Sequence, residues 1–325
     1  MIATPELIDA APRTGVKNNH DPLEKQPPAE KIYLTGRPTL HQFLSFVKRE
    51  GAGPYEKGAL IAEWQAANEH LQSLKTQEAG LADHPPVGKL GPEYEPLLIE
   101  FLRDPLVRHG FNAVPTEVGL VELDRLVVYQ KHIDLNYVRQ LQEKIGAAPD
   151  RDTIFRICLP YEHPFPPVKW SRLRGNRFVF VSPSNDLRFL GTMPLQSRHI
   201  TGYPPPGAVV GVVGVTVGFG SNFLNAVRAQ NRIILNNGSH RAYTLRSLGI
   251  THVPCIIQHV SSRAELDVVA ASAVRREPAC FLEDPRPSVL KDYFDPKLHK
   301  VVQVHPRLRQ VTVKFEVDEA YIPAL

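Results

Sequence analysis

Four consecutive residues, Gly238 to Arg241, have types and spacing that could bind a phosphate group. They spell Gly-Ser-His-Arg and directly follow the apolar run RIIL and two asparagines. Glycine adopts turns in which several backbone N–H groups converge, and a helix that begins at such a turn favours an anion at its N-terminus. The imidazole of His240 could add a donor, and the guanidinium of Arg241 could bind two phosphate oxygens at once.

Two interpretations of the same residues involve no ligand. Asn237-Gly238 after an apolar run is a strong β-hairpin signal, and the next residues would then form a returning strand. The second interpretation is a helix cap followed by an exposed His-Arg pair that binds nothing. The spacing decides against the hairpin, because Ala242, Leu245 and Leu248 fall three apart, as on one face of a helix.

The residues around this helix predict a unit of strand, glycine turn, helix and strand. Ser239 is a good N-cap, so we expect the helix to span about Ser239 to Leu248. Gly249 suits the left-handed residue that follows a helix. The run THVPCIIQHV then supplies a second strand, with Pro254 near its start.

The whole chain has the composition of a soluble globular protein. It has 325 residues, of which 42% are hydrophobic and 22% charged, and this length suggests roughly two domains. The sequence contains no run that could span a bilayer and no signal peptide at its start, so we expect a cytoplasmic protein with no membrane partner. Three widely spaced cysteines predict free thiols, no disulfide framework and no metal site of the chain's own: Cys158, Cys255 and Cys280.

The charge is mildly basic, with a net value of +4 and an isoelectric point near 8.9. Two clusters, Lys169–Arg177 and Lys297–Lys314, concentrate lysines and arginines without acids. Either could face phosphates, although each taken singly is more often a solvated surface. The charge distribution is thus compatible with DNA as a partner but does not favour it. We expect no sequence-specific binding of duplex DNA.

Changes in composition, together with proline and glycine residues that interrupt helices and strands, divide the chain into segments. Residues 1–30 are polar and Pro-rich, as in a flexible tail, and residues 31–110 carry helical spacing. The block from Val118 to Gly146 combines an alternating strand, VGLVEL, with a helix capped by Asp134. The resulting domain prediction is a helical module at 31–110, a core at 111–260 with a Pro-rich insertion at about 147–208, and a β-rich extension at 261–325.

Two blocks, Val118–Gly146 and Arg232–Ile257, together resemble the ParB/sulfiredoxin superfamily. The second block carries the more specific signature, a strand followed by Gly-x-His-Arg, a helix ending in Leu-Gly, and Val-Pro before the next strand. The resemblance implies an α/β (α+β) fold: a ParB/sulfiredoxin-like core, with the helical module and the β-rich C-terminal extension added. It also implies that Asn237 to Arg241 cradle the phosphates of ATP, ADP or CTP, with Mg²⁺ as the accompanying ion.

Departures from the family narrow what the resemblance implies. Sulfiredoxins carry a reactive cysteine where this chain has Ser239, which argues against the repair of oxidised peroxiredoxins. The free-serine kinases of the family place a catalytic glutamate just before the first helix, where this chain has none. The candidate catalytic residues are therefore His240 together with Glu122 or Asp186 as the base. Partition proteins continue with a helix-turn-helix, and the sequence after Val260 shows no such pattern.

Three hypotheses follow, in order of preference. The first is a nucleotide-dependent phosphotransferase or hydrolase that acts on a small molecule, with an acceptor pocket formed by Val181–Phe189 and Arg198–Tyr203. The second is a partition-like DNA-binding protein that uses the nucleotide as a switch. The third is a non-catalytic module whose helical part docks a partner. The sequence leaves the oligomeric state open.

Overall fold

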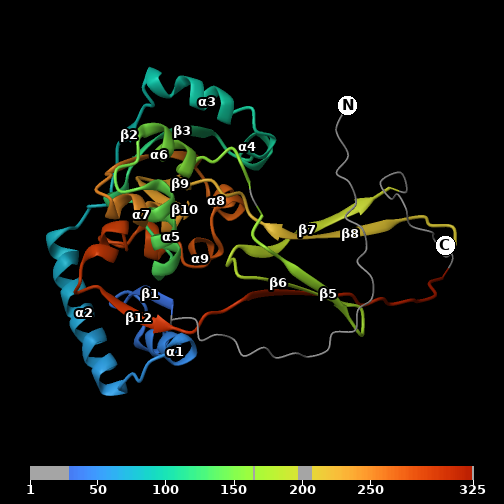
Figure 1. The fold of residues 1–325 in the computed structure, drawn as a ribbon, viewed down its shortest axis with the longest axis horizontal. Helices are drawn as coiled ribbons and strands as arrows, with labels where there is room; N and C mark the ends of the chain where they lie inside the picture. The colour runs from blue at the N-terminus through green and yellow to red at the C-terminus, as the bar shows by residue number, and fades with distance from the viewer. Residues whose placement is uncertain (1–28, 164, 197–206, 324–325) are drawn as a thin grey trace.

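The computed structural model describes residues 29–163, 165–196 and 207–323. The tail predicted for residues 1–30 and the predicted acceptor segment Arg198–Tyr203 lie wholly or almost wholly outside these ranges. The described chain is a mixed α/β structure with several sheets (Figure 1). In the part of the chain that the structure describes, no helix is long and apolar enough to cross a membrane.

The helices are short except for one that precedes the core. The α-helices are α1 (Leu40–Glu50), α2 (Lys57–Gln77), α3 (Glu95–Phe101), α4 (Pro105–Gly110), α5 (Leu135–Ile145), α6 (Arg151–Cys158), α7 (Ser239–Ser247), α8 (Arg263–Val269), α9 (Ser272–Arg276) and α10 (Ala279–Leu282). Single 3₁₀ turns are η1 (Pro92–Tyr94), η2 (Leu123–Arg125) and η4 (Leu290–Phe294). The sequence predicts one helix within residues 261–274, where the structure has α8 and the start of α9, and it does not predict α10, which is too short to show a period.

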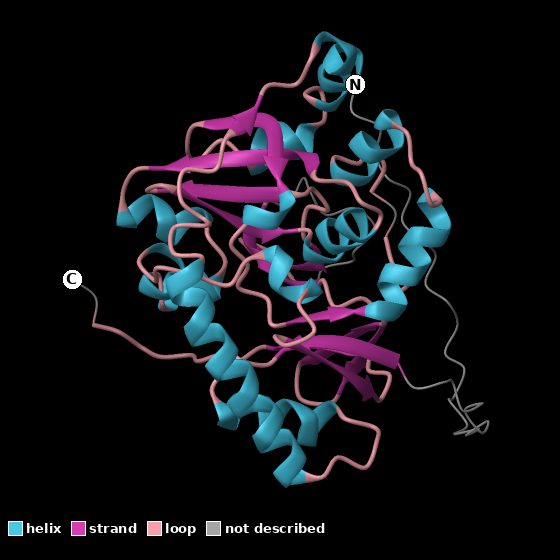
Figure 2. Ribbon diagram, turned by 90° about the vertical axis from the view of Figure 1, so that its left-hand side faces the viewer, coloured by secondary structure: helices cyan, strands magenta, loops and turns pink. Residues whose placement is uncertain are grey.

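The strands form sheets of different sizes. They are β1 (Ala29–Leu34), β2 (Val87–Gly88), β3 (Thr116–Glu122), β4 (His132–Asp134), β5 (Lys169–Leu173), β6 (Arg177–Ser182), β7 (Leu187–Leu195), β8 (Val212–Phe219), β9 (Asn225–Ala229), β10 (Arg232–Asn237), β11 (His252–Val260), β12 (His299–Val304) and β13 (Arg309–Lys314). The largest sheet has the order β10-β9-β11-β3-β2, and β9 runs parallel to β11 while the other pairs are antiparallel. Figure 2 shows helices packed beside these strands.

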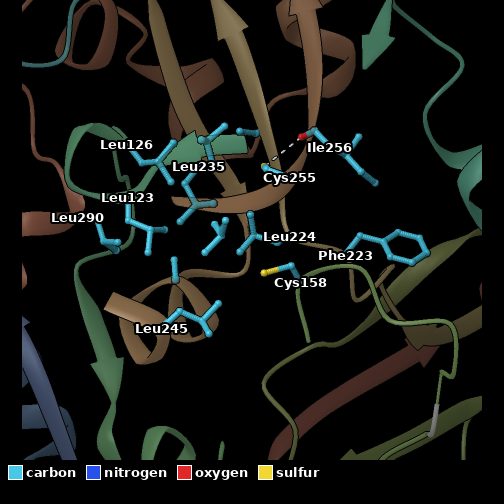
Figure 3. Close-up of a cluster of buried hydrophobic side chains, with 14 of the residues drawn as sticks. Leu123, Leu126, Cys158, Phe223, Leu224, Leu235, Leu245, Cys255, Ile256 and Leu290 are labelled. Atoms are coloured by element: carbon cyan, nitrogen blue, oxygen red, sulfur yellow. Dashed lines mark hydrogen bonds between the residues drawn. The ribbon is translucent and has the colours of Figure 1, made fainter. Parts of the chain in front are cut away.

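The main core lies between the largest sheet and the helices α5, α6 and α7. Ala242 and Leu245 of α7 are fully buried there, as the spacing of three predicts. They pack with Leu235 and Ile256 from the strands and with Leu224, which directly precedes β9 (Figure 3). Cys158 and Cys255 also belong to this cluster, and the structure leaves all three cysteines as free thiols. α7 is thus fixed by burial, which holds its first turn in one position.

Strand pairing brings segments that are far apart in the sequence next to each other. A second sheet has the order β12-β1-β4, so β1 pairs with a strand some 270 residues later as well as with the strand that leads into α5. β13 pairs instead with β6 in a third sheet, β13-β6-β5, beside the β7-β8 hairpin (Figure 1). The predicted segments 31–110 and 261–325 are consequently interleaved with the core and with each other. The predicted insertion at 147–208 also includes α6, whose Phe155 and Cys158 are core residues.

Candidate functional site

The glycine turn and the helix predicted after it are present, and no hairpin forms. Gly238 is the N-cap of α7 and has the left-handed conformation, with φ 101° and ψ 22°. Ser239 is therefore the first helical residue and not the cap that the sequence suggested. Gly249 follows the helix with φ 83°, as predicted. A residue with a Cβ would be strained at Gly238, which explains why glycine stands there.

The first turn of α7 carries backbone N–H groups that the helix cannot satisfy. The carbonyl of Gly238 accepts the first intrahelical bond, from the N–H of Ala242, at 2.9 Å. Within the described residues, no side chain caps the N-terminus of α7. The N–H groups of Ser239, His240 and Arg241 are thus the donors that an anion would meet at this end of the helix.

Arg241 lies beneath the turn, and its side chain is only 4% exposed. Its Nη1 donates to the carbonyls of Ile157 and Cys158, both at 3.1 Å, and of Asn222 at 2.6 Å. A Cβ added at Gly238 would lie 3.2 Å from Nη2, so the guanidinium folds back against the turn. The sequence placed Arg241 at a helix start outside the core, whereas the structure buries it. The side chain ties the end of α6 and the loop before β9 to α7.

The charge of Arg241 has no anionic partner among the residues that the structure describes. Its partners are neutral carbonyls, and burial lowers the pKa of its guanidinium below the usual value. A buried cation without a counterion is costly, because carbonyl dipoles replace only part of its hydration. The positive end of the α7 dipole adds to the same field. This end of α7 therefore has a positive potential that an anion would relieve.

His240 bridges to the neighbouring helix. Its Nε2 accepts a hydrogen bond from the backbone N–H of Asp134 at 3.0 Å. Nε2 is then an acceptor, and the neutral ring carries its proton on Nδ1. Burial lowers the pKa of His240 to about 4, although Asp134 opposes this. The predicted catalytic use of His240 is limited by this bond, since Nε2 has no free lone pair for general base chemistry and only Nδ1–H could donate to a ligand.

The N-terminus of α5 lies beside that of α7. The Oδ1 of Asp134 caps α5 by accepting from the N–H groups of Asn136 and Tyr137, as the sequence predicts. The Tyr137 ring meets the His240 ring edge to face, with centroids 5.3 Å apart. The N-termini of α5 and α7 therefore lie next to each other. The two helices belong to Val118–Gly146 and Arg232–Ile257, the two sequence blocks that carry the resemblance.

The asparagines before the turn anchor it to three other segments. Asn237 Nδ2 donates to the carbonyls of Ser221 and Phe223, at 2.8 and 3.1 Å. The amide of Asn236 donates to the carbonyl of Val269 and accepts the N–H of Ala271, which ties the turn to α8 and α9. Asn237, a predicted phosphate ligand, thus has its side-chain donors directed at protein carbonyls.

Glu122 does not lie with the turn. It stands at the end of β3, and Asp124, two residues on, pairs with Arg246 in the last turn of α7 at 2.6 Å. α7 has nine residues, so its two ends are about 13 Å apart. Glu122 therefore lies near the opposite end of the helix from Gly238.

Asp186 is connected to the turn through one loop. Its Oδ2 accepts the backbone N–H of Gly220 at 2.9 Å, and its other oxygen pairs with Arg188. The two residues after Gly220 are Ser221 and Asn222, whose carbonyls accept from Asn237 and Arg241. Sequence reasoning did not identify this loop.

The two described cavities lie elsewhere on the largest sheet. One of about 320 Å³ is lined by residues that include Lys89, Glu117 and Arg228, and one of about 210 Å³ shares Arg228 and includes His259. Neither includes a residue of the glycine turn. Among residues 29–163, 165–196 and 207–323, no group of three or more His, Cys, Asp and Glu side chains could hold a metal ion.

Comparison of the chain with protein-family models found no match, and comparisons with curated proteins and with solved structures found no significant similarity.

Proposed function

We propose that the first turn of α7 binds a phosphate group of a nucleotide, as ATP, ADP or CTP, in a ParB/sulfiredoxin-like core. One observation carries the proposal: a buried arginine without a carboxylate partner in the described chain lies directly under a helix N-terminus that no side chain caps. Arg241 would act through its charge and by holding the turn, while the N–H groups of Ser239 to Arg241 would donate to the phosphate.

The reaction that such a site supports best is phosphoryl transfer or hydrolysis. These reactions need positioned donors and positive charge more than covalent chemistry by the protein. Mg²⁺ would arrive with the nucleotide, because this ion usually binds phosphate oxygens and keeps several waters. Of the carboxylates first considered as the base, Asp186 has contacts that lead to the turn, and Glu122 does not. The proposed roles are therefore Asp186 as the base and His240 Nδ1–H as a donor to the phosphate.

A thermal-shift screen of the full chain against ATP, ADP, CTP and GTP, each with and without Mg²⁺, tests the proposal. A ligand that binds only the folded protein must raise its melting temperature. Ser239→Asp and Ser239→Asn form a matched pair of similar size that differ in charge. A carboxylate at the first helical position suits the α7 dipole but repels a phosphate. We expect the nucleotide shift to survive in Ser239→Asn and to vanish in Ser239→Asp. Equal shifts in both variants would contradict phosphate binding at this turn.

The partition-like alternative, in which a nucleotide switches DNA binding, uses the same turn. After β11 the described chain has only the short α-helices α8, α9 and α10, of seven, five and four residues, and the 3₁₀ turn η4. No observation there favours a helix that reads the major groove, so the enzyme hypothesis stays first. Including duplex DNA in the same screen separates the two, because a switch would make nucleotide binding depend on DNA.

A further inference from the structure

The sheet β13-β6-β5 has no buried face of its own. Every residue of β5 is exposed, and the four residues from Phe178 to Val181 of β6 are only half-buried. In Figure 1 this sheet extends away from the main body together with the β7-β8 hairpin. An antiparallel sheet usually packs one face on a core, so a sheet open on both sides offers a surface for a partner.

One face of this sheet is aromatic. Residues directly opposite each other in antiparallel strands share a face. Trp170, Phe180 and Val311 therefore form one row, and Arg172, Phe178 and Val313 form the next. The Trp170 ring is stacked with Phe180 at 6.3 Å, and the Arg172 guanidinium lies 5.7 Å from the centre of the Phe178 ring. Trp170 remains 66% exposed, so a face of its ring is available to a further flat group.

The same strands are strongly basic. The segments Lys169–Ser182 and Arg309–Lys314 contain no Asp or Glu. Their six cations are Lys169, Arg172, Arg174, Arg177, Arg309 and Lys314. Within the described residues, none of them forms an ion pair with a carboxylate; Arg177 and Arg309 donate only to backbone carbonyls. Arg172 and Arg309 lie on the aromatic face, whereas Lys169, Arg177 and Lys314 lie on the opposite face. The cations of the aromatic face form no ion pair in the described chain and are complementary to a polyanion.

We propose that this face binds single-stranded DNA, with bases stacked on Trp170 and its aromatic neighbours and phosphates beside Arg172 and Arg309. Proteins that bind single-stranded nucleic acid combine aromatic rings, on which the bases stack, with cations that contact the phosphates. Trp170 and Arg172 are two residues apart, which is about 6.6 Å along a strand, whereas stacked bases in a duplex rise about 3.4 Å. The spacing of the two rows of side chains therefore matches bases that are unstacked from one another. The bases of a duplex are stacked and cannot contact both rows in this way.

Two features favour DNA over the other occupants. Val311 and Val313 continue the aromatic rows, and a 2′-hydroxyl placed against them would lose its hydration without an acceptor side chain, which disfavours RNA. A second copy of the chain would bring Arg172 and Arg309 of this face close to the same two cations of the other copy, which disfavours a symmetric dimer through it. The inference does not rest on the proposed phosphate site at α7.

The fluorescence of Trp170 provides a direct test. The chain has two tryptophans, and Trp64, which donates to the carbonyl of Pro38, lies in α2. In Trp64→Phe full-length protein, Trp170 is the only tryptophan, so emission excited at wavelengths that tyrosine does not absorb comes from it alone. Titration with an oligo(dT) of about 15 nucleotides should quench it in a saturable way, because a stacked base contacts the ring. An unquenched emission while the labelled oligonucleotide binds elsewhere, or the absence of binding at low salt, would overturn the proposal.

Variants and competitor ligands complete the test by fluorescence anisotropy. Trp170→Ala should weaken binding roughly fivefold to a hundredfold, as loss of a base–aromatic stack does. Arg172→Ala should lower the slope of log affinity against log salt by about 0.7. Lys57→Ala, which removes an exposed cation at the start of α2, is the charge-matched control and should change neither value. Equal losses in all three variants would mean a diffuse charge effect and overturn the proposal.

The competitors separate the other occupants. Oligo(dT) should bind more tightly than a duplex of equal length, oligo(rU) or a poly-glutamate peptide. If any of these binds as tightly through Trp170, the assignment to single-stranded DNA is wrong. Sedimentation at the same protein concentrations should show an unchanged mass when Trp170 is mutated. A dimer that dissociates in Trp170→Ala would show that a second copy covers this face instead.

Discussion

The backbone N–H of Asp134 donates a hydrogen bond to Nε2 of His240, with 3.0 Å between the two nitrogens. The two residues are 106 positions apart, and each belongs to the first turn or cap of a helix. One neutral imidazole thus joins the N-termini of α5 and α7. The bond requires an unprotonated Nε2, so it links the local structure to pH.

We expect the protein to lose stability as the pH falls from about 6.5 to about 4. Burial lowers the pKa of His240 and of His132 to about 4 each, whereas the unfolded chain has the usual value near 6.5. Between these values the unfolded state binds more protons, so folding weakens as the pH falls, by up to about 1.4 kcal/mol per pH unit and histidine. Urea unfolding at pH 7, 5.5 and 4.5 measures this.

His132→Phe separates the contribution of one histidine. The His132 ring is stacked with Phe46 at 5.7 Å, and a phenyl ring can keep that contact without titrating. The variant should show a shallower decline of the unfolding free energy with falling pH. A decline as steep as in the wild type would show that His132 is not held neutral by burial.

Two arginines of α7 should differ in their effect on stability. Arg241→Ala removes a buried cation and leaves the carbonyls of Ile157, Cys158 and Asn222 without this donor, so we expect a loss of about 2–4 kcal/mol of unfolding free energy. Arg246→Ala breaks a partly exposed pair with Asp124 and should cost about 1 kcal/mol or less. Denaturant titration measures both, and similar losses would contradict the structural role of Arg241.

Gly238→Ala should destabilise the protein more than Gly146→Ala. Both glycines have positive φ, 101° and 76°, so alanine is strained at either. A Cβ at Gly146 meets no atom within 4 Å, whereas one at Gly238 would lie 3.1 Å from the Cγ of Leu224. We expect the unfolding free energy to fall by about 1 kcal/mol in Gly146→Ala and by more in Gly238→Ala. Equal effects on the melting temperature would show that Leu224 yields without cost.

The local features of the site could be predicted because they depend on neighbouring residues. The spacing of Ala242 and Leu245 identified α7, and Asp134 was recognised as the cap of α5. The left-handed residue after the helix was predicted at Gly249 and is found there, whereas the cap was predicted at Ser239 and is Gly238. These features are determined within one or two turns of chain, where capping and periodicity operate.

The tertiary partners could not be predicted from the same evidence. Nothing near Arg241 indicates that its Nη1 donates to carbonyls at 157, 158 and 222, because the sequence gives no distance between these segments. The pairing of β1 with β12 likewise depends on a chain reversal over most of the molecule. The consequence for the site is that the burial of the Arg241 side chain could not be predicted from the sequence.

The most direct test of nucleotide binding at α7 is the amide N–H spectrum of the ¹⁵N-labelled full-length protein during titration with ADP, ATP or CTP and Mg²⁺. Phosphate binding to backbone N–H groups must change the resonances of those groups. We predict saturable shifts that are largest at Ser239, His240 and Arg241, and their absence in Ser239→Asp. Saturable shifts confined to the cavity around Arg228, or no shift at these three residues with any of the nucleotides, would contradict the proposal.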